Sequence, residues 1–507
     1  MFRDGARKSI WQSEIKRFEN LPNQDQLFDV VIVGGGITGI STAYRLQLTG
    51  LKCILLEANN IGFGTTGGTT AHLNDFFDTT YKEAISKFGL ENAKLLAQAG
   101  KEAIQIVHNN VQRHSIECDF IYKNAHLFAL DDQQVKELED IVEGANKIGY
   151  EMNYVKEIDY PIPFKKAVLI PKQAQFHPIK YIKALAEAYE QAGGMIVENC
   201  MVETYEEEEN EVSLKTSLGD IKCKNVVYAT HTPPGISLLH FTTAPYRSYA
   251  IAFTLNNNQY PTTLGYDLNE PYHYYRTQEL DGQTYIIAGG EDHKTGHADD
   301  TGVCFSNLEN YCRKYFDVKT VEYSWSSQYF EPADGMPSIG VAPSSNGRVF
   351  IATGYRGNGM TFGTIASSVL SDLITGASSP YEKLFNPKRF KPTAGFTSFI
   401  KENAAVVKDL ITDKISMERI QSLAEIKEGE AKVVKYEGRA YAIYAEQDGR
   451  LHVLKSTCPH AQCEVRWNNA ELSWDCPCHG SRFNINGRIL TGPATEGLER
   501  LDEQISE

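Results

Sequence analysis

Two short segments near the end of the chain contain four residues with the spacing of metal ligands. One residue separates Cys458 from His460, and two residues separate Cys476 from His479 further along the chain. Thiolate sulfur and imidazole nitrogen are the donors that proteins offer to zinc and to some iron–sulfur centres. Two such pairs on two loops can therefore hold either a structural zinc ion or an electron-carrying cluster.

A glycine-rich turn near the start of the chain has the pattern of a dinucleotide site. The sequence FDVVIVGGGITGIST places Gly34, Gly36 and Gly39 between a run of apolar residues at 30–33 and an expected helix. The first glycine permits a tight turn, the second lets the backbone approach a pyrophosphate, and the third lets the helix pack on the strand. Glu57, after the next expected strand, can accept hydrogen bonds from ribose hydroxyls. We therefore predict a bound dinucleotide.

Two further glycine-rich stretches favour FAD over NAD. A Gly/Thr loop occupies 59–73, and a turn, a strand, a glycine loop and a helix are expected over 331–376. Together with the first turn, they resemble FAD-dependent oxidoreductases of the D-amino-acid oxidase, glycine oxidase and D-amino-acid dehydrogenase superfamily, over about residues 28–378. The resemblance implies that the late glycine loop closes over the flavin. It implies FAD contacts at Thr66, Gly67, Gly354, Arg356, Gly357, Gly359, Met360 and Thr361, beside Gly34, Gly36, Gly39 and Glu57.

The substrate site departs from the pattern of amino-acid-oxidising relatives. In those proteins an arginine shortly before the DG-P-IG element holds the substrate carboxylate, whereas WSSQYFEPADGMPSIG places Tyr329 and no arginine there. A guanidinium is the natural bidentate partner of a carboxylate, so this segment does not favour an amino-acid substrate. Arg247, Arg276 or Arg356 can take its place from elsewhere. Arg356 lies inside the closing loop and more readily serves the flavin.

Catalytic residues are marked less clearly than cofactor residues. Tyr274 lies within the aromatic run YHYY at 272–275, and Arg276 follows it directly. The run can line a pocket or place alternate tyrosines in the core. His72 follows the Gly/Thr loop and can lie near the flavin, although a lone histidine is more often packed or solvated. We keep His72, Tyr274 and Arg276 as candidates.

The residues around the C-terminal ligand pairs favour an iron–sulfur centre, with zinc as the alternative. CPHAQC and CPCHGS resemble the two cluster loops of Rieske 2Fe-2S domains, and GPA at 492–494 resembles their third loop. In that family two thiolates hold one iron and two imidazoles hold the other. The resemblance implies the cluster ligands Cys458, His460, Cys476 and His479. It also implies a disulfide between Cys463 and Cys478, as in the respiratory type.

These resemblances and patterns give a fold class. We expect an α/β FAD-binding (Rossmann-like) domain with an interleaved α+β substrate domain, plus a small all-β C-terminal Rieske domain. The expected boundaries are an N-terminal extension at 1–27, FAD-binding segments at 28–80, 172–235 and 332–378, substrate segments at 81–171 and 236–331, a linker with an amphipathic helix at 379–418, and the Rieske domain at 419–507.

Composition excludes some partners. The net charge is −15, from 50 basic and 65 acidic residues, which argues against nucleic acid and against an anionic membrane surface. No apolar run approaches the roughly 18 residues that span a bilayer, and the first residues lack the apolar core of a secretory signal. The six remaining cysteines are scattered, as reduced thiols are. We expect a cytoplasmic location.

The predicted function is that of a flavoprotein oxidoreductase. It takes a hydride from a C–N or C–O bond of a small molecule, such as an amine or an amino acid, and passes electrons through the cluster to an external acceptor. One alternative runs electrons from an external donor through the cluster to flavin and substrate. The other is a redox or electron-carrier module without substrate chemistry, which the absent arginine favours.

Overall fold

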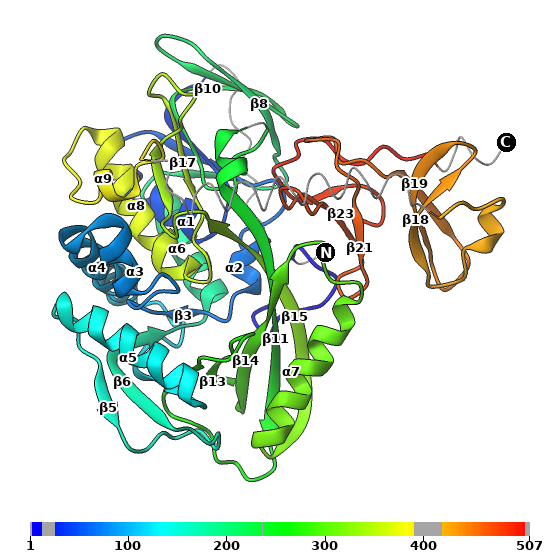
Figure 1. Cartoon of the computed structure of the whole chain (residues 1–507). Helices are drawn as coiled ribbons and strands as arrows, with labels where there is room; N and C mark the ends of the chain where they lie inside the picture. The colour runs from blue at the N-terminus through cyan, green and yellow to red at the C-terminus, as the bar shows by residue number, and fades with distance from the viewer. Residues whose placement is uncertain (1–2, 13–25, 236, 390–417, 502–507) are drawn as a thin grey trace.

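The computed structural model describes residues 3–12, 26–235, 237–389 and 418–501. The amphipathic helix predicted around residues 399–411 lies outside these residues. Figure 1 shows a large body of sheets and helices, with a smaller C-terminal part attached at one side. Within the described residues, no helix is both long and apolar enough to cross a membrane.

The first sheet is mainly parallel and contains the glycine turn. β1 (Leu27–Val33) pairs in parallel with β10 (Gly219–Tyr228) on one side and with β2 (Cys53–Leu56) on the other. Its residues 30–33 are buried, as expected for a parallel strand covered on both faces. Across the sheet the strands are β16 (Ser338–Val341), β17 (Val349–Thr353), β10 (Gly219–Tyr228), β1 (Leu27–Val33), β2 (Cys53–Leu56) and β7 (Met195–Val197), with β9 (Val212–Thr216) and β8 (Val202–Glu207) extending from β10. Helix α1 (Ile37–Gln47) packs against α6 (Pro178–Gln191) and α8 (Gly359–Thr375).

The second sheet is largely antiparallel. Its order is β15 (Val318–Pro332), β11 (Thr243–Leu255), β14 (Gln283–Lys294), β13 (Tyr274–Leu280), β12 (Leu264–Asp267), β4 (Ile121–Ala129), β6 (Lys166–Gln175) and β3 (His72–Leu73), with β5 (Asn153–Val155) beside β6. The sheet thus includes residues 72–73 and 172–175, which the sequence analysis assigns to the FAD-binding domain. The remaining helices are α2 (Thr65–Gly68), α3 (Tyr81–Phe88), α4 (Leu90–His114), α5 (Asp132–Lys147), α7 (Thr301–Tyr315), α9 (Glu382–Phe385), η1 (Leu238–Thr242) and η2 (Leu423–Glu425).

The two large sheets share a hydrophobic core. One cluster of buried side chains contains Val30 and Ile32 from the first sheet together with Ala250 and Ile287 from the second. Burial of apolar area contributes about 25 cal/mol per Å² to folding. The interleaved segments of the body therefore fold as one unit, and the two sheets hold a fixed position relative to one another.

The C-terminal part contains two small antiparallel sheets. The outer sheet consists of β18 (Ala431–Tyr436), β19 (Arg439–Ala445) and β20 (Leu451–Lys455). The inner sheet consists of β21 (Arg466–Asn468), β22 (Ser473–Asp475), β23 (Arg482–Asn484) and β24 (Ile489–Thr491). β21 and β23 lie next to the body, whereas β18 and β19 lie on the far side (Figure 1).

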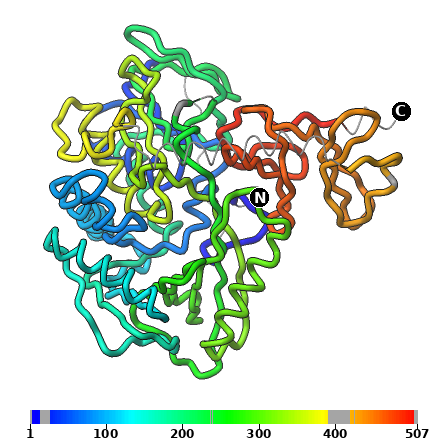
Figure 2. The backbone as a smooth tube through the Cα atoms, viewed as in Figure 1, coloured from blue at the N-terminus to red at the C-terminus, as the bar shows by residue number. Residues whose placement is uncertain are grey.

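The described N-terminal segment, residues 3–12, runs between the body and the inner sheet (Figure 2). Asp4 donates its backbone N–H to the carbonyl of Phe63, and Ala6 donates to the carbonyl of Glu471. Arg3 and Trp11 are buried. This segment therefore belongs to the interface between the two parts of the molecule.

Candidate functional site

One cavity of about 1720 Å³ lies between the two large sheets and the C-terminal part. Its lining comes from the glycine turn after β1, the loop between β17 and α8, the second sheet, and residues 486–492 before and within the third loop. Pockets that bind drug-sized ligands have volumes of about 300–1,000 Å³. The cavity therefore has room for a dinucleotide together with a small substrate.

The glycine turn has the backbone that a dinucleotide site requires. Gly34 has a φ of +110°, and a Cβ on Gly39 would lie 1.8 Å from the carbonyl oxygen of Gly34. Gly36 is the N-cap of α1 and lines the cavity, and the first turn of α1 contains no acidic side chain. A helix N-terminus of this kind favours an anionic phosphate group. These residues fit the dinucleotide that the sequence predicts.

Glu57 and Thr66 border the same turn. Glu57 Oε2 accepts a hydrogen bond from the Gly35 N–H at 2.6 Å, and its Oε1 accepts from the Asn59 N–H at 2.8 Å. Burial raises the pKa of the Glu57 carboxyl, and the two N–H donors oppose that rise. The Thr66 hydroxyl accepts from the N–H of Ile37 at 3.1 Å. Both side chains line the cavity.

The late glycine loop closes the cavity from the other side. Gly354 and Arg356 have φ values of +77° and +51°, so the chain turns sharply between β17 and α8. The N–H of Gly357 donates to Asp78 Oδ2 at 2.9 Å. The guanidinium of Arg356 forms an ion pair with Glu331 and donates to the hydroxyl of Thr79. Arg356 therefore fixes the loop rather than standing free for a substrate.

Not every predicted FAD residue reaches the cavity. Gly34, Gly36, Glu57, Thr66, Arg356, Gly357, Gly359 and Met360 line it. Gly39, Gly67, Gly354 and Thr361 are outside the lining. Thr361 donates its hydroxyl to the carbonyl of Asn74 at 2.7 Å, and a Cβ on Gly67 would lie 2.3 Å from the carbonyl oxygen of Gly62. These residues shape the backbone behind the site.

His72 and Arg276, two of the three catalytic candidates, bond to other parts of the protein through both His72 ring nitrogens and both terminal nitrogens of Arg276. His72 Nε2 donates to the carbonyl of Tyr275 at 3.2 Å, and Nδ1 pairs with the Thr70 hydroxyl at 3.0 Å. Burial lowers the pKa of His72 to about 3. Arg276 is buried and donates to the carbonyls of Thr70 and Ala71 at 3.1 and 2.8 Å. Both residues hold the Gly/Thr loop against the second sheet.

The tyrosines of the run 272–275 lie on both faces of the sheet, some lining the cavity and one packing in the core. Tyr272 and Tyr274 line the cavity, and Tyr274 shares a hydrogen bond of 2.9 Å with Ser248. Tyr275 is fully buried in a core cluster behind the sheet. The alternation of the strand therefore gives one face to the cavity and the other to the core.

The four predicted cluster ligands converge on one point of the C-terminal part. Cys458 and Cys476 are buried, and a hydrogen bond from the Cys476 thiol lowers the pKa of Cys458. The rings of His460 and His479 are 5.0 Å apart. The Nδ1 atom of each histidine is buried without a hydrogen-bond partner. Two adjacent thiols and two unpartnered imidazole nitrogens fit a 2Fe-2S cluster, because these are the donors it requires.

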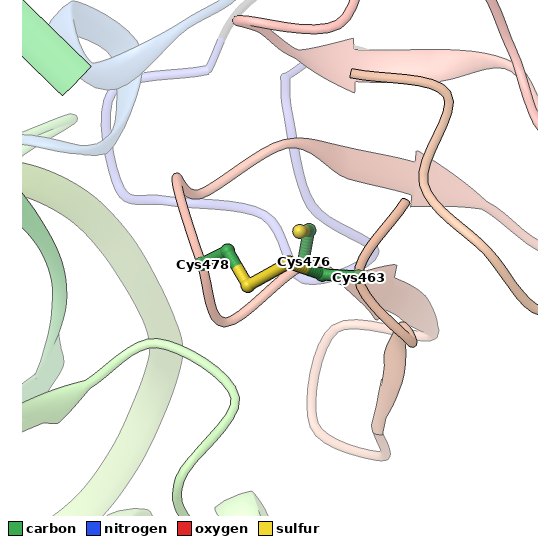
Figure 3. Close-up of side chains that lie close together, drawn as sticks. All are labelled: Cys463, Cys476 and Cys478. Carbon is green, nitrogen blue, oxygen red and sulfur yellow. A yellow bond between two sulfur atoms is a disulfide. The ribbon is translucent and has the colours of Figure 1, made fainter. Parts of the chain in front are cut away.

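The surrounding loops brace this centre. Cys463 and Cys478 form a disulfide that joins the two ligand loops, with Cys476 beside it (Figure 3). The hydroxyl of Ser481 accepts from the N–H of Ala494 at 3.0 Å, so the third loop is held over the centre. Phe483 is buried in the same hydrophobic cluster as the ligand cysteines.

The imidazole side of the centre faces the body. His460 Nε2 donates to the carbonyl of Gly235 at 3.0 Å, and the Gly235 N–H donates to the carbonyl of Pro493 in the third loop at 2.9 Å. The ring of His240 lies 4.9 Å from His460 and 5.7 Å from His479. Gly235 and His240 of the body therefore contact both ligand loops and the third loop.

A buried network of charges fastens the inner sheet to the body. Glu471 accepts from Arg3 at 3.3 Å and from the N–H of Ser326 at 2.9 Å, and it lies 3.9 Å from Arg247. Burial alone would raise the pKa of Glu471, but the guanidinium groups of Arg3 and Arg247 outweigh burial and hold it below its usual value. Arg482 pairs with Asp475 and also with Asp4 of the N-terminal segment.

Comparison with known families accounts for both halves of this arrangement. The family model for FAD dependent oxidoreductases matches residues 29–373. The chain belongs to this family. The model for the Rieske [2Fe-2S] domain matches residues 417–502 of this oxidoreductase. FAD and one 2Fe-2S cluster are therefore its cofactors.

Three individual proteins illustrate the relationship. This oxidoreductase is 34% identical to a Bacillus subtilis protein named for a Rieske 2Fe-2S iron–sulfur centre, YhfW, over 99% of each chain. It is 24% identical to gamma-glutamylputrescine oxidoreductase of Escherichia coli, over 74% of this chain and 90% of the other. The structure of glycine oxidase from Geobacillus kaustophilus superposes with a TM-score of 0.60 at 19% identity, covering 72% of this chain and 99% of that one. The last comparison supports the fold of the body.

Sequence reasoning about the oxidoreductase missed residues in the cavity and beside the cluster. Gly235 is a turn glycine in THTPPG, and nothing in that pattern indicates contact with a domain more than 200 residues away. Asp292 lies in β14, in the run GGED, and lines the cavity. Gly290 pairs with Tyr249 of the core cluster behind the sheet, and the register shifts beside this pair, so period-two alternation from Gly290 places Asp292 on the wrong face. The N-terminal residues 3–12 gave no motif at all.

Proposed function

We propose that this oxidoreductase is a dehydrogenase for a small molecule with an oxidisable C–N bond, and that its electrons leave through the Rieske centre. Bound FAD supplies a two-electron hydride acceptor, and the cluster supplies a one-electron carrier. The proposal assigns the cluster to Cys458, His460, Cys476 and His479. It assigns the flavin to the eight cavity-lining residues named above.

The observation that carries the proposal is the position of Gly235. The chain leaves β10 at Tyr228, lines the FAD cavity at residues 229–232 and reaches the ligand histidine His460 at Gly235. Gly235 is thus only three residues beyond the last cavity-lining residue of this segment, Thr232. Residues of the third loop, including Gly492, line the same cavity. If the cluster exchanged electrons with an unrelated partner, this contact would serve no purpose. Electron transfer between flavin and cluster, in contrast, requires the cluster to be held beside the cavity.

Removal of one cluster ligand tests the direction of electron flow. Cys476→Ser removes a thiolate from the centre and leaves the cavity lining unchanged. We expect an amine that reduces the flavin anaerobically in the wild type to do so in the variant within about twofold. Turnover with ferricyanide, a one-electron acceptor, should fall at least about a hundredfold. Flavin content, measured by absorbance, should equal that of the wild type.

Cys304→Ser is the matched control, because Cys304 lies in α7, outside the cluster site, and forms no disulfide. It should keep both flavin reduction and turnover. Unchanged turnover in Cys476→Ser would show that the cluster is off the electron path. Loss of flavin reduction by an external donor in that variant would favour the reverse direction. The cytoplasmic location remains part of the proposal, and cell fractionation tests it.

A further inference from the structure

A carboxylate with one unsatisfied oxygen faces the cavity from the second sheet. Asp292, in β14, accepts a hydrogen bond at Oδ2 from the Tyr329 hydroxyl at 3.0 Å. Its Oδ1 is enclosed and has no hydrogen-bond partner. Among the described residues, no lysine or arginine forms an ion pair with it. Proteins rarely enclose a carboxylate without a cation, because the uncompensated charge costs several kcal/mol.

Tyrosine side chains surround this carboxylate. Tyr329 and Tyr246, on neighbouring strands, stack with ring centroids 5.7 Å apart, and Tyr272 and Tyr274 lie 5.6 Å apart. Gly289 accommodates this arrangement, since a Cβ there would lie 2.2 Å from the Tyr274 ring. Aromatic faces within about 6 Å attract a cation. An anion and several aromatic rings in one cavity form a site for a positive charge.

The three arginines that the sequence offers in place of the missing clamp are committed elsewhere. Arg356 pairs with Glu331. Arg276 donates to backbone carbonyls. Arg247 lies in the buried network with Glu471 at the C-terminal part. None of the three substitutes that the sequence offers for the missing clamp is free to hold a carboxylate.

We propose that the cavity binds a protonated amine that carries no carboxylate beside its amino group, with Asp292 as the anion that pairs with the ammonium and Tyr272, Tyr274 and Tyr329 as its aromatic walls. This inference rests on the proposed function, since it names the substrate class of the same site. Burial raises the pKa of Asp292 to about 7. A bound ammonium would offset that burial and keep the carboxylate ionised.

Binding of unreactive probes tests the proposal without turnover. Phenyltrimethylammonium carries a permanent positive charge and has no nitrogen lone pair from which a C=N bond can form, so it cannot be oxidised as an amine, and benzoate is a flat anion of similar size. Each is titrated into the oxidised holoenzyme and followed by the visible absorbance of the flavin. The wild type should bind the cation at least about tenfold more tightly than benzoate. Asp292→Asn, which keeps the shape and removes the charge, should weaken cation binding at least about tenfold.

Asp131→Asn is the matched control. Asp131 lines the same cavity and caps α5, and asparagine caps a helix as well as aspartate does. This variant should bind the cation within about twofold of the wild type. Tyr272→Leu, which removes an aromatic face and leaves Asp292 unchanged, should weaken cation binding about fivefold.

Two results would overturn the proposal: tighter binding of benzoate by the wild type, or cation binding by Asp292→Asn within twofold of the wild type. If Asp292→Asn does not retain flavin, Tyr272→Leu provides the test instead. Unchanged cation binding by that variant would overturn the proposal that the tyrosine rings bind the cation. Failure here is distinct from failure of the proposed function. Amines that reduce the flavin regardless of Asp292 would leave the dehydrogenase intact and remove the cation site, whereas Asp292-dependent binding with no amine oxidised would do the reverse.

Discussion

The two small sheets of the Rieske domain differ in how they relate to the body. The inner sheet and its loops contribute Glu471, Asp475 and Arg482 to the buried network, and His460 bonds to Gly235, three residues after the cavity-lining Thr232. The outer sheet has a hydrophobic cluster of its own, with Val434 and Ile443 at its centre. The Rieske domain is therefore packed against the body and is not merely tethered to it. The half that holds the cluster is built into the oxidoreductase, and its distance from the flavin cavity is fixed by packing.

We expect the largest difference between the inner and outer sheets when the buried charge network is disrupted, measured as the free energy of unfolding. Glu471→Gln leaves Arg3 and Arg247 without their shared carboxylate, and breaking a buried pair costs about 3–5 kcal/mol. We expect the free energy of unfolding to fall by that amount in denaturant titrations. Glu430→Gln in the outer sheet removes a partly exposed pair with Lys432, and should cost about 0–1 kcal/mol. Equal costs for the two variants would erase the distinction between the halves.

The disulfide between Cys463 and Cys478 is expected to stabilise the inner half of the domain without holding the cluster itself. Replacement of both Cys463 and Cys478 by serine opens a link between residues 15 apart, which in the loop-entropy relation is worth about 3 kcal/mol. We expect a lower melting temperature with the cluster retained, because neither residue is a predicted ligand. Mass spectrometry of the native protein and iron analysis of the variant check both statements. Free thiols in the native protein would contradict the first, and loss of iron would contradict the second.

The smallest effect is expected at Phe483. Tyrosine there adds one hydroxyl donor beside the ligand sulfurs, and a donor stabilises the more negative reduced state. A net hydrogen bond is worth about 0.5–1.5 kcal/mol, which for one electron corresponds to a rise of roughly 20–65 mV. A redox titration followed by EPR measures the shift in Phe483→Tyr. Phe28→Tyr, in β1 of the body, is the control and should leave the potential unchanged.

The sequence predicted well those turns and loops whose geometry depends on a few neighbouring residues. Gly34, Gly36 and Gly39 mark their turn because backbone geometry there depends on residues within one strand and one helix. Cys458, His460, Cys476 and His479 mark their loops for the same reason. Both matches identify cofactors, and the family comparisons confirm FAD and the 2Fe-2S cluster.

Contacts between distant segments could not be predicted in this way. His72 and Arg276 were candidates because of their types, yet their polar atoms pair with carbonyls that only the fold brings near. Asp292 gave no motif, since its significance depends on tyrosines from three other segments. The pairing of His460 with Gly235 spans 225 residues, and no spacing rule reaches that far.

The N-terminal segment adds a constraint on the order of assembly. Arg3 is separated from Glu471 by 468 residues, and ribosomes add about 5–20 residues each second. Roughly 25–95 s therefore pass between the synthesis of the first partner and that of the second. During translation Arg3 cannot pair with Glu471 until residue 471 has been made. The junction between the flavin domain and the cluster domain therefore closes only after both partners have been synthesised.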